Sequence, residues 1–184
     1  MGKAKTPRPA KLIVAAFAAE PTLLAQARDA LVAEYGPVDW ESECLTFDHT
    51  DYYAAEFGVD LVRLIWSFER LIDPQTLPDI KISTNELEQR WVVDGKRRIN
   101  LDCGYISMAK LVLATTKDYD HRLYMRRGIY AEVTLHFRDG SFQPWPWTYP
   151  DYASQPYREM FAGIRQRYMA QLRQSDTGTG ALDA

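Results

Sequence analysis

Two consecutive parts of this chain follow the same order of a strand, a helix and a strand. In the first part, the apolar run Leu12–Ala18 is typical of a buried strand. A helix is expected to begin at Pro21, since a first helical turn tolerates proline, and to end at Gly36-Pro37. The partly alternating run Val38–Phe47 indicates a second strand. The helix would bury residues at helical spacing: Leu24, Ala27, Leu31 and Tyr35.

The second part begins near Gly58 with an alternating strand. Asp73-Pro74 then starts a helical region, which Pro78 is expected to kink or divide. Asp94-Gly95 predicts a turn before the strand Arg97–Asp102. The first strand would place its apolar residues on one face (Val62, Leu64, Trp66, Phe68) and polar ones on the other (Arg63, Ser67, Glu69). The helix would bury Ile80, Thr84, Leu87 and Trp91.

This order predicts an α+β fold with a ferredoxin-like split βαβ core, in which two helices pack on one face of an antiparallel sheet. Tyr105–Lys117 suits either a helix or a buried strand. The remaining chain is expected to extend the sheet with C-terminal strands, two of them joined by a turn at Asp139-Gly140, and to end in a closing helix over Tyr157–Leu172. The expected strands are His121–Met125, Gly128–Phe137 and Phe142–Trp145.

The length and composition indicate one globular domain. The chain has 184 residues, of which 46% are hydrophobic and 26% charged, so it is able to bury a sizeable core. We expect a single domain over residues 11–173. The basic, proline-containing residues 1–10 and the polar residues 174–184 are expected to be disordered tails.

Charge and cysteine content limit the class of function. The net charge of -3 makes nucleic acid an unlikely partner, since such proteins grip phosphates with an excess of cations. Cys44 and Cys103 have no metal or disulfide spacing, which indicates reduced thiols and a cytoplasmic protein. No apolar run reaches the ~20 residues of a membrane span. Three histidines without ligand spacing argue against zinc. The cofactor and the oligomeric state cannot be predicted.

Polar side chains are concentrated in the second half of the chain. Alternation along Ile129–His136 places one set of side chains on one face of that strand: Tyr130, Glu132, Thr134 and His136. The opposite face would carry Ile129, Ala131, Val133 and Leu135. On the strand Arg97–Asp102, Asn100 and Asp102 likewise share a face.

If these faces line one concavity together with Lys110, Lys117, His121 and Arg122, cations would lie beside a carboxylate and an imidazole. Such a set holds a phosphate or carboxylate by charge-assisted hydrogen bonds. The leading hypothesis is therefore a small anionic ligand, a nucleotide or a phosphorylated metabolite. The alternative hypothesis is an enzyme in which Glu132 and His121 perform acid–base chemistry. An antiparallel sheet with one solvated face shows the same alternation without any ligand.

Two further segments allow alternative interpretations. The aromatic stretch Trp145–Tyr152 is expected either to cover the core or to serve as a protein-interaction module. Asp48, Asp51 and Glu56 offer carboxylates for a hard cation, although a turn-capping role suits their spacing better.

Eight ordered motifs over residues 10–170 resemble one family. They are Phe47–Tyr53, Ser67–Ile72, Thr84–Glu88, Asn100–Tyr105, Lys110–Lys117, His121-Arg122, Gly128–Leu135 and Pro146–Tyr152. The chain resembles the prokaryotic family catalogued as domain of unknown function 4416, some members of which carry the label GTP-binding protein. The resemblance implies a stand-alone prokaryotic domain. The phosphate-binding loop G-x-x-x-x-G-K-[ST] is missing, since neither Gly2-Lys3 nor Gly95-Lys96 has its flanking residues.

Overall fold

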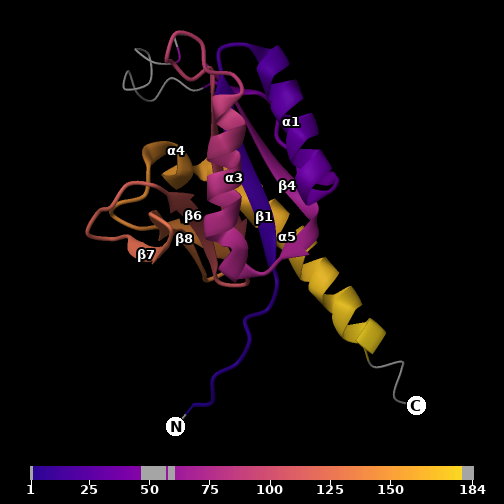
Figure 1. Ribbon diagram of the computed structural model, residues 1–184. Coiled ribbons are helices and arrows are strands. Elements are labelled where there is room, and N and C mark those ends of the chain that lie inside the picture. Colours follow the sequence, from indigo (N-terminus) through magenta and orange to yellow (C-terminus); the bar gives the residue numbers. More distant parts are fainter. Residues whose placement is uncertain (1, 47–56, 58–60, 180–184) are drawn as a thin grey trace.

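A computed structural model describes residues 2–46, 57 and 61–179 (Figure 1). The expected carboxylate turn at Asp48–Glu56 lies outside the described residues. The strands are β1 (Ala10–Ala18), β2 (Val38–Glu41), β3 (Leu45–Thr46), β4 (Val62–Ile72), β5 (Ile99–Ile106), β6 (Lys110–Thr115), β7 (Leu123–Arg126), β8 (Ile129–Arg138) and β9 (Ser141–Pro144). The helices are α1 (Pro21–Tyr35), the 3-10 turn η2 (Pro74–Thr76), α3 (Leu77–Gln89), α4 (Pro150–Ala153) and α5 (Gln155–Thr179).

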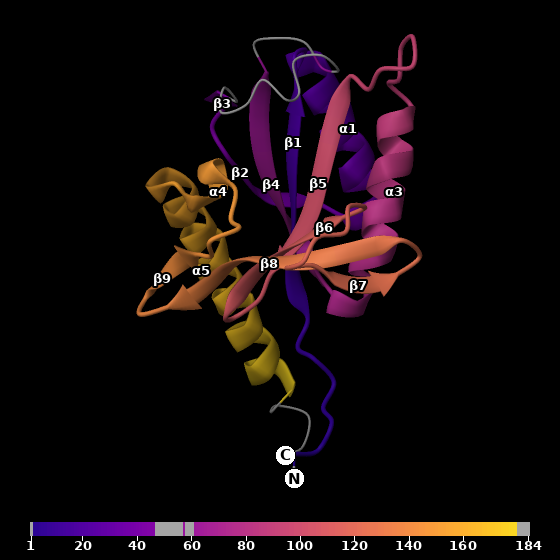
Figure 2. The same cartoon turned by 90° about the vertical axis from the view of Figure 1, so that its left-hand side faces the viewer.

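The strands form one antiparallel sheet in the order β2-β4-β1-β5-β6-β8-β7, with β3 beside β4 and β9 beside β8. An α+β fold with an antiparallel sheet is thus confirmed. Helices α1 and α3 lie on one face and α5 lies on the other (Figures 1 and 2). Every residue of β1 is buried, because this strand lies between β4 and β5 and both of its faces are covered. None of the described helices has the length and apolar character to cross a membrane.

Each face of the sheet has its own hydrophobic core. The core under α1 and α3 contains Trp66 and Phe68, as the alternation along β4 predicts. The core under α5 contains Ile65, Phe161 and Ile164. Of the polar residues predicted on the other face of β4, Arg63 and Ser67 are buried, whereas Glu69 is exposed.

Several expected boundaries differ from the structure. The strand expected at Val38–Phe47 divides into β2 and β3, because Ser42 between them bonds to Ile65 through its own N–H and its hydroxyl oxygen. The ambiguous region Tyr105–Lys117 is a hairpin of β5 and β6. Pro78 lies in the first turn of α3, where it disrupts no helical hydrogen bond, so the division falls between η2 and α3. At the C-terminus, α5 continues as a helix to Thr179.

The two halves of the sheet diverge between β5 and β6. These strands pair only where residues 104–106 meet residues 111–113, and Figure 2 shows β6, β8 and β7 crossing the direction of β1, β4 and β5. Gly104 lies at this crossing, and a Cβ atom there would stand 2.3 Å from the carbonyl oxygen of Val112. The bare edge of β5 is covered by α3. Lys81 Nζ donates to the carbonyl of Leu101 (2.9 Å), and Glu88 Oε1 accepts from the N–H of Leu101 (2.6 Å).

A β-bulge interrupts the alternation along β8. Leu135 pairs with Leu111 and Val133 pairs with Val112, so Thr134 is the extra residue on β8. Ile129, Ala131 and Val133 accordingly lie in the core under α1 and α3, whereas Leu135 lies in the core under α5. The prediction that Leu135 shares a face with Val133 is wrong, because the bulge rotates the strand between them.

Candidate functional site

The candidate site lies in a gap along the outer edge of β8. β7 pairs with residues 129–131 and β9 pairs with residues 135–138, which leaves Glu132–Thr134 without a strand on that side. The segment that follows β9 fills this gap with side chains. Trp147 Nε1 donates to the carbonyl of Val133 (3.2 Å), and the Thr148 hydroxyl donates to the carbonyl of Thr134 (2.6 Å).

Glu132 is the centre of the site. Its Oε2 atom accepts from Arg122 Nε (2.8 Å) and lies 3.2 Å from His121 Nε2, while its Oε1 atom accepts from the Thr134 hydroxyl (3.2 Å). The structure therefore brings together Glu132, His121, Arg122 and Thr134, all of which are candidate residues from the sequence. The β7–β8 hairpin explains this proximity, since it folds the residues before β7 back onto β8.

Arg122 is a structural partner of this carboxylate. The side chains of Arg122 and Glu132 are each only 3% exposed. Arg122 also donates to the carbonyl of Lys117 (3.0 Å) and to the Tyr149 hydroxyl (3.2 Å), and its guanidinium lies over the ring of Tyr119. Burial alone lowers the pKa of Arg122, but the hydrogen bond and the charge of Glu132 outweigh it and raise that pKa. This ion pair is closed to solvent, so Arg122 is not an open anion holder.

A column of stacked rings runs beside the site. Its members, in order, are Tyr119, His121, Trp147, Trp145 and His136, with successive ring centroids 6.1, 5.3, 5.2 and 4.3 Å apart. The first three contacts are nearly parallel, and the last is tilted by 37°. The stack holds the His121 ring between Tyr119 and Trp147, which leaves its edges for polar contacts.

A shallow hollow of about 480 Å³ opens beside this column, lined by Asp120, His121, Pro146 and Trp147. His121 Nδ1 lies 3.1 Å from Asp120 Oδ1. The Asp120 side chain is 98% exposed, so this contact is easily exchanged for another acceptor. His121 thus connects a buried carboxylate on one side with an exposed carboxylate on the other.

Asn100 and Asp102 belong to a second polar group on β5. Asn100 Nδ2 donates to Asp102 (2.8 Å), and Lys81 Nζ lies 3.6 Å from Asp102. Arg97 donates to both Asn100 (3.3 Å) and Glu88 (3.0 Å). Burial raises the pKa of Glu88, although Lys81 and the Leu101 N–H partly oppose it.

Sequence reasoning missed Lys81, Glu88 and Arg97 in this second group. Lys81 and Glu88 are two helical turns apart on α3, and that spacing is the one signal that relates them. The described contacts connect Asn100 and Asp102 with α3, and connect Glu132 with the residues before β7. The polar residues expected to line one concavity therefore lie in two separate polar groups.

The remaining candidate residues lie around the edges of these groups. Lys110 is exposed at the start of β6, opposite His136. Lys117 is exposed, and its backbone carbonyl holds Arg122. Tyr130 is half-buried and packs edge-to-face on Tyr124 of β7, with ring centroids 5.4 Å apart.

Another buried ion pair anchors the end of the aromatic segment. Arg63 on β4 pairs with Asp151 at the start of α4, and its guanidinium lies over the rings of Phe17 and Tyr152. Burial raises the pKa of Tyr152 well above its ordinary value. Strand alternation predicts Arg63 on the polar face of β4 but does not indicate its pairing with Asp151.

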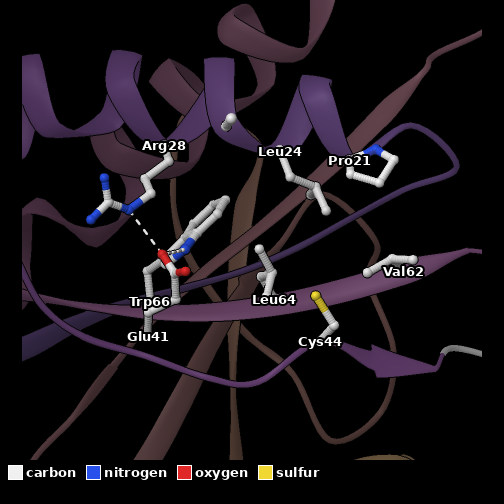
Figure 3. Close-up of a pocket in the computed structure, with 9 residues that line it drawn as sticks. Pro21, Leu24, Arg28, Glu41, Cys44, Val62, Leu64 and Trp66 are labelled. Atoms are coloured by element: carbon white, nitrogen blue, oxygen red, sulfur yellow. Dashed lines mark hydrogen bonds and ion pairs between the residues drawn. The ribbon is translucent and has the colours of Figure 1, made fainter.

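A second hollow, of about 260 Å³, lies between α1 and β4 (Figure 3). Its floor is apolar, with Leu24 and Leu64 among the lining residues. Its polar groups pair with one another, because Glu41 Oε2 accepts from both Arg28 Nε (2.9 Å) and Trp66 Nε1 (2.8 Å). Figure 3 shows the Cys44 thiol at the wall of this hollow. Within the described part of the chain, no three His, Cys, Asp or Glu side chains are grouped to hold a metal ion.

Comparison with known proteins identifies the family. The model of a family described as Domain of unknown function (DUF4416) matches residues 8–168. The chain belongs to the DUF4416 family. No curated protein and no solved structure matches the chain. In this DUF4416 domain the matched region ends at Tyr168 in α5, so it includes both polar groups and the complete sheet.

Proposed function

We propose that this DUF4416 domain binds a small anionic ligand in the hollow beside His121. The observation that carries the proposal is the position of the His121 ring, whose Nε2 atom faces the buried Glu132 and whose Nδ1 atom faces the exposed Asp120. A phosphate or carboxylate on the ligand would take the place of Asp120 at Nδ1.

The charges of the site support an anion. Glu132 is shared by Arg122 and His121, so protonation of the imidazole gives the three side chains one net positive charge. Asp120 is the exposed negative group near this charge, and an exposed pair of this kind contributes little free energy.

The walls of the hollow support a ligand with an apolar body. Trp147 and Pro146 supply apolar surface next to the charged edge of His121. Both faces of the Trp147 indole are covered by its stacking neighbours, so the ligand would contact the edge of this ring. A nucleotide or another phosphorylated metabolite combines an anionic group with such a body.

Binding experiments test separately whether the site holds an anionic group and whether it holds an apolar ligand body. We would titrate the full chain with nucleoside monophosphates, sugar phosphates and inorganic phosphate, using calorimetry and thermal unfolding. A ligand at a hundredfold excess over its Kd stabilises the fold by about 2.7 kcal/mol. His121→Gln should weaken binding about 10- to 100-fold, as expected for the loss of a charge-assisted hydrogen bond. Asp120→Asn should strengthen it about two- to five-fold, since a competing carboxylate is removed.

Asp29→Asn on the exposed surface of α1 is the matched control, since it changes net charge equally but lies on a different element. Binding that responds equally to Asp120→Asn and Asp29→Asn would indicate a general charge effect and would contradict a site at His121. If inorganic phosphate binds with the same affinity as the larger ligands, Trp147 and Pro146 contribute nothing to the affinity.

Acid–base catalysis is the second candidate function, favoured by the two carboxylates on opposite sides of the His121 ring. In that case His121 would exchange the proton with a substrate in the hollow. Glu132 would orient the ring through its contact with Nε2. The test is whether the protein hydrolyses or isomerises a bound phosphorylated ligand. This function is supported if His121→Gln abolishes the reaction and if the rate depends on a single ionisation in its pH profile.

The finer fold assignment and the location are also inferences. Strand order β5-β1-β4-β2, with α1 after β1 and α3 after β4, supports a ferredoxin-like arrangement of the first half of the chain. The free thiols of Cys44 and Cys103 support a cytoplasmic location.

A further inference from the structure

β7 ends the sheet, and no strand of the described chain lies along its outer edge. All four of its residues are exposed, with Leu123 at 73%, Tyr124 at 62% and Met125 at 42%. Natural edge strands usually carry charged residues, prolines or bulges that prevent pairing with another chain. β7 has a register irregularity between Tyr124 and Arg126 and one charged residue, Arg126, but its other three residues are large, apolar and exposed.

Most of the exposed large apolar side chains of the described residues come from the second half of the chain. Among the large apolar side chains that are exposed in the described residues, all except Val93 come from residues 108–149. They are Met108, Tyr119, Leu123, Tyr124, Met125, Trp145, Trp147 and Tyr149. Three of them, Leu123, Tyr124 and Met125, are consecutive on β7, and contiguous apolar surface marks an interaction site more often than scattered single residues do.

The charges at the two ends of β7 have opposite signs. Asp118 and Asp120 precede the strand, while Arg126 and Arg127 are at its end. Both arginines contact Asp79 on α3, but these side chains are about half exposed and their pairing is weak. The exposed charges before the strand are two aspartates and Lys117, and those at its end are two arginines, so its beginning is more acidic than its end.

We propose that two copies of this chain associate through β7, antiparallel and around a two-fold axis. Antiparallel pairing places the acidic end of one strand beside the basic end of its partner, at both ends of the interface. Parallel pairing would place like charges together. A symmetric dimer uses the same surface twice, as this self-complementary strand requires. It would satisfy the outer backbone groups of β7 and cover Leu123 and Met125 of both copies.

Sedimentation velocity and light scattering of the full chain over a range of concentrations test this interface. The expected species has twice the 21.2 kDa mass of the chain. Leu123→Lys and Met125→Lys should each shift the equilibrium to monomer without lowering the Tm of the monomer, because both side chains are exposed. Val93→Lys is the matched control, since it places the same charge on an exposed apolar residue away from β7, and it should leave the dimer intact.

A charge exchange tests the direction of pairing. Asp118→Lys alone and Arg127→Asp alone should weaken the dimer, and the two changes combined in one chain should restore it. Aspartate suits position 127, because Arg127 has a positive φ of 56°. A mass of 21.2 kDa at every concentration overturns the proposal. A dimer that survives both β7 substitutions also overturns it, and so does one that the combined charge exchange fails to restore.

Discussion

Gly104 is the residue at which the two halves of the sheet cross, and it leaves no room for a side chain. A Cβ atom there would lie 2.3 Å from the Val112 carbonyl oxygen and 2.7 Å from Leu113 Cδ2. Gly104→Ala should destabilise the fold by about 2–4 kcal/mol, since the neighbouring β6 backbone must move. Gly163→Ala is the control. Its Cβ meets nothing within 4 Å on the exposed side of α5, so urea denaturation should show a gain of about 0.5–1 kcal/mol.

Cys103 predicts a change in stability at alkaline pH. Burial raises the pKa of its thiol from 9.0 to about 11. Between these values the unfolded thiol loses its proton while the folded thiol keeps it, so stability falls as pH rises. Across this window Cys103 should account for a loss of about 2–3 kcal/mol.

Comparison with Cys103→Ala isolates this contribution from the buried tyrosines, which titrate in the same range. The difference in unfolding free energy between wild type and Cys103→Ala should be constant below pH 9 and should shrink as pH approaches 11. A constant difference across the whole range would show that the thiol does not carry the effect.

At the residue scale, the sequence indicates Glu132, His121 and Arg122 as candidate site residues, and the structure brings the three side chains together. Alternation along the strand predicts that Glu132 lies on its polar face, and the β7–β8 hairpin brings His121 close to it. Alternation does not reveal that Arg122 is buried. Glu132→Gln would leave that guanidinium buried without its counter-charge, at a cost of about 3–5 kcal/mol. His121→Gln is therefore the sharper probe of function.

At the scale of elements, α3 substitutes for a missing strand along β5. Glu88→Leu should destabilise the fold by about 2–4 kcal/mol, because it leaves the buried Leu101 N–H unpaired and removes the carboxylate that pairs with Arg97. Glu88→Gln keeps an acceptor and should cost less, about 1–3 kcal/mol. Amide exchange at Leu101 should accelerate in Glu88→Leu and change little in Glu88→Gln. Equal exchange in both variants would contradict the capping role.

The elements themselves were largely predictable, whereas their relative placement was not. The helical spacing of α1 and the turn at Asp139-Gly140 depend on local chemistry, which the sequence contains. The separation of Asn100 and Asp102 from Glu132 depends on the divergence of β5 and β6, which is a long-range property. The bulge at Thr134 also has no local signal, because no glycine or proline marks it.

At the scale of the whole molecule, α5 holds the N-terminal strand. Tyr168 donates through its hydroxyl to the carbonyl of Pro9 (2.8 Å), and Lys11 donates to Gln171 (2.8 Å). A chain that ends after Arg167 should lose about 4–6 kcal/mol, since it no longer buries Tyr168 and Leu172. A chain that ends after Ser175 should keep its Tm. Thermal unfolding of the two truncations measures the difference, and equal Tm values would contradict this role of α5.

The paired contacts of Lys81 and Glu88 with Leu101 have a consequence for natural variation in this family. Either replacement by itself leaves a backbone group of Leu101 without its hydrogen-bond partner, so single steps away from this pair pass through a damaged fold. Positions 81 and 88 should thus be inherited as a unit. A relative that lacks one member should also lack the other, and should carry a longer β6 that supplies the missing hydrogen bonds itself.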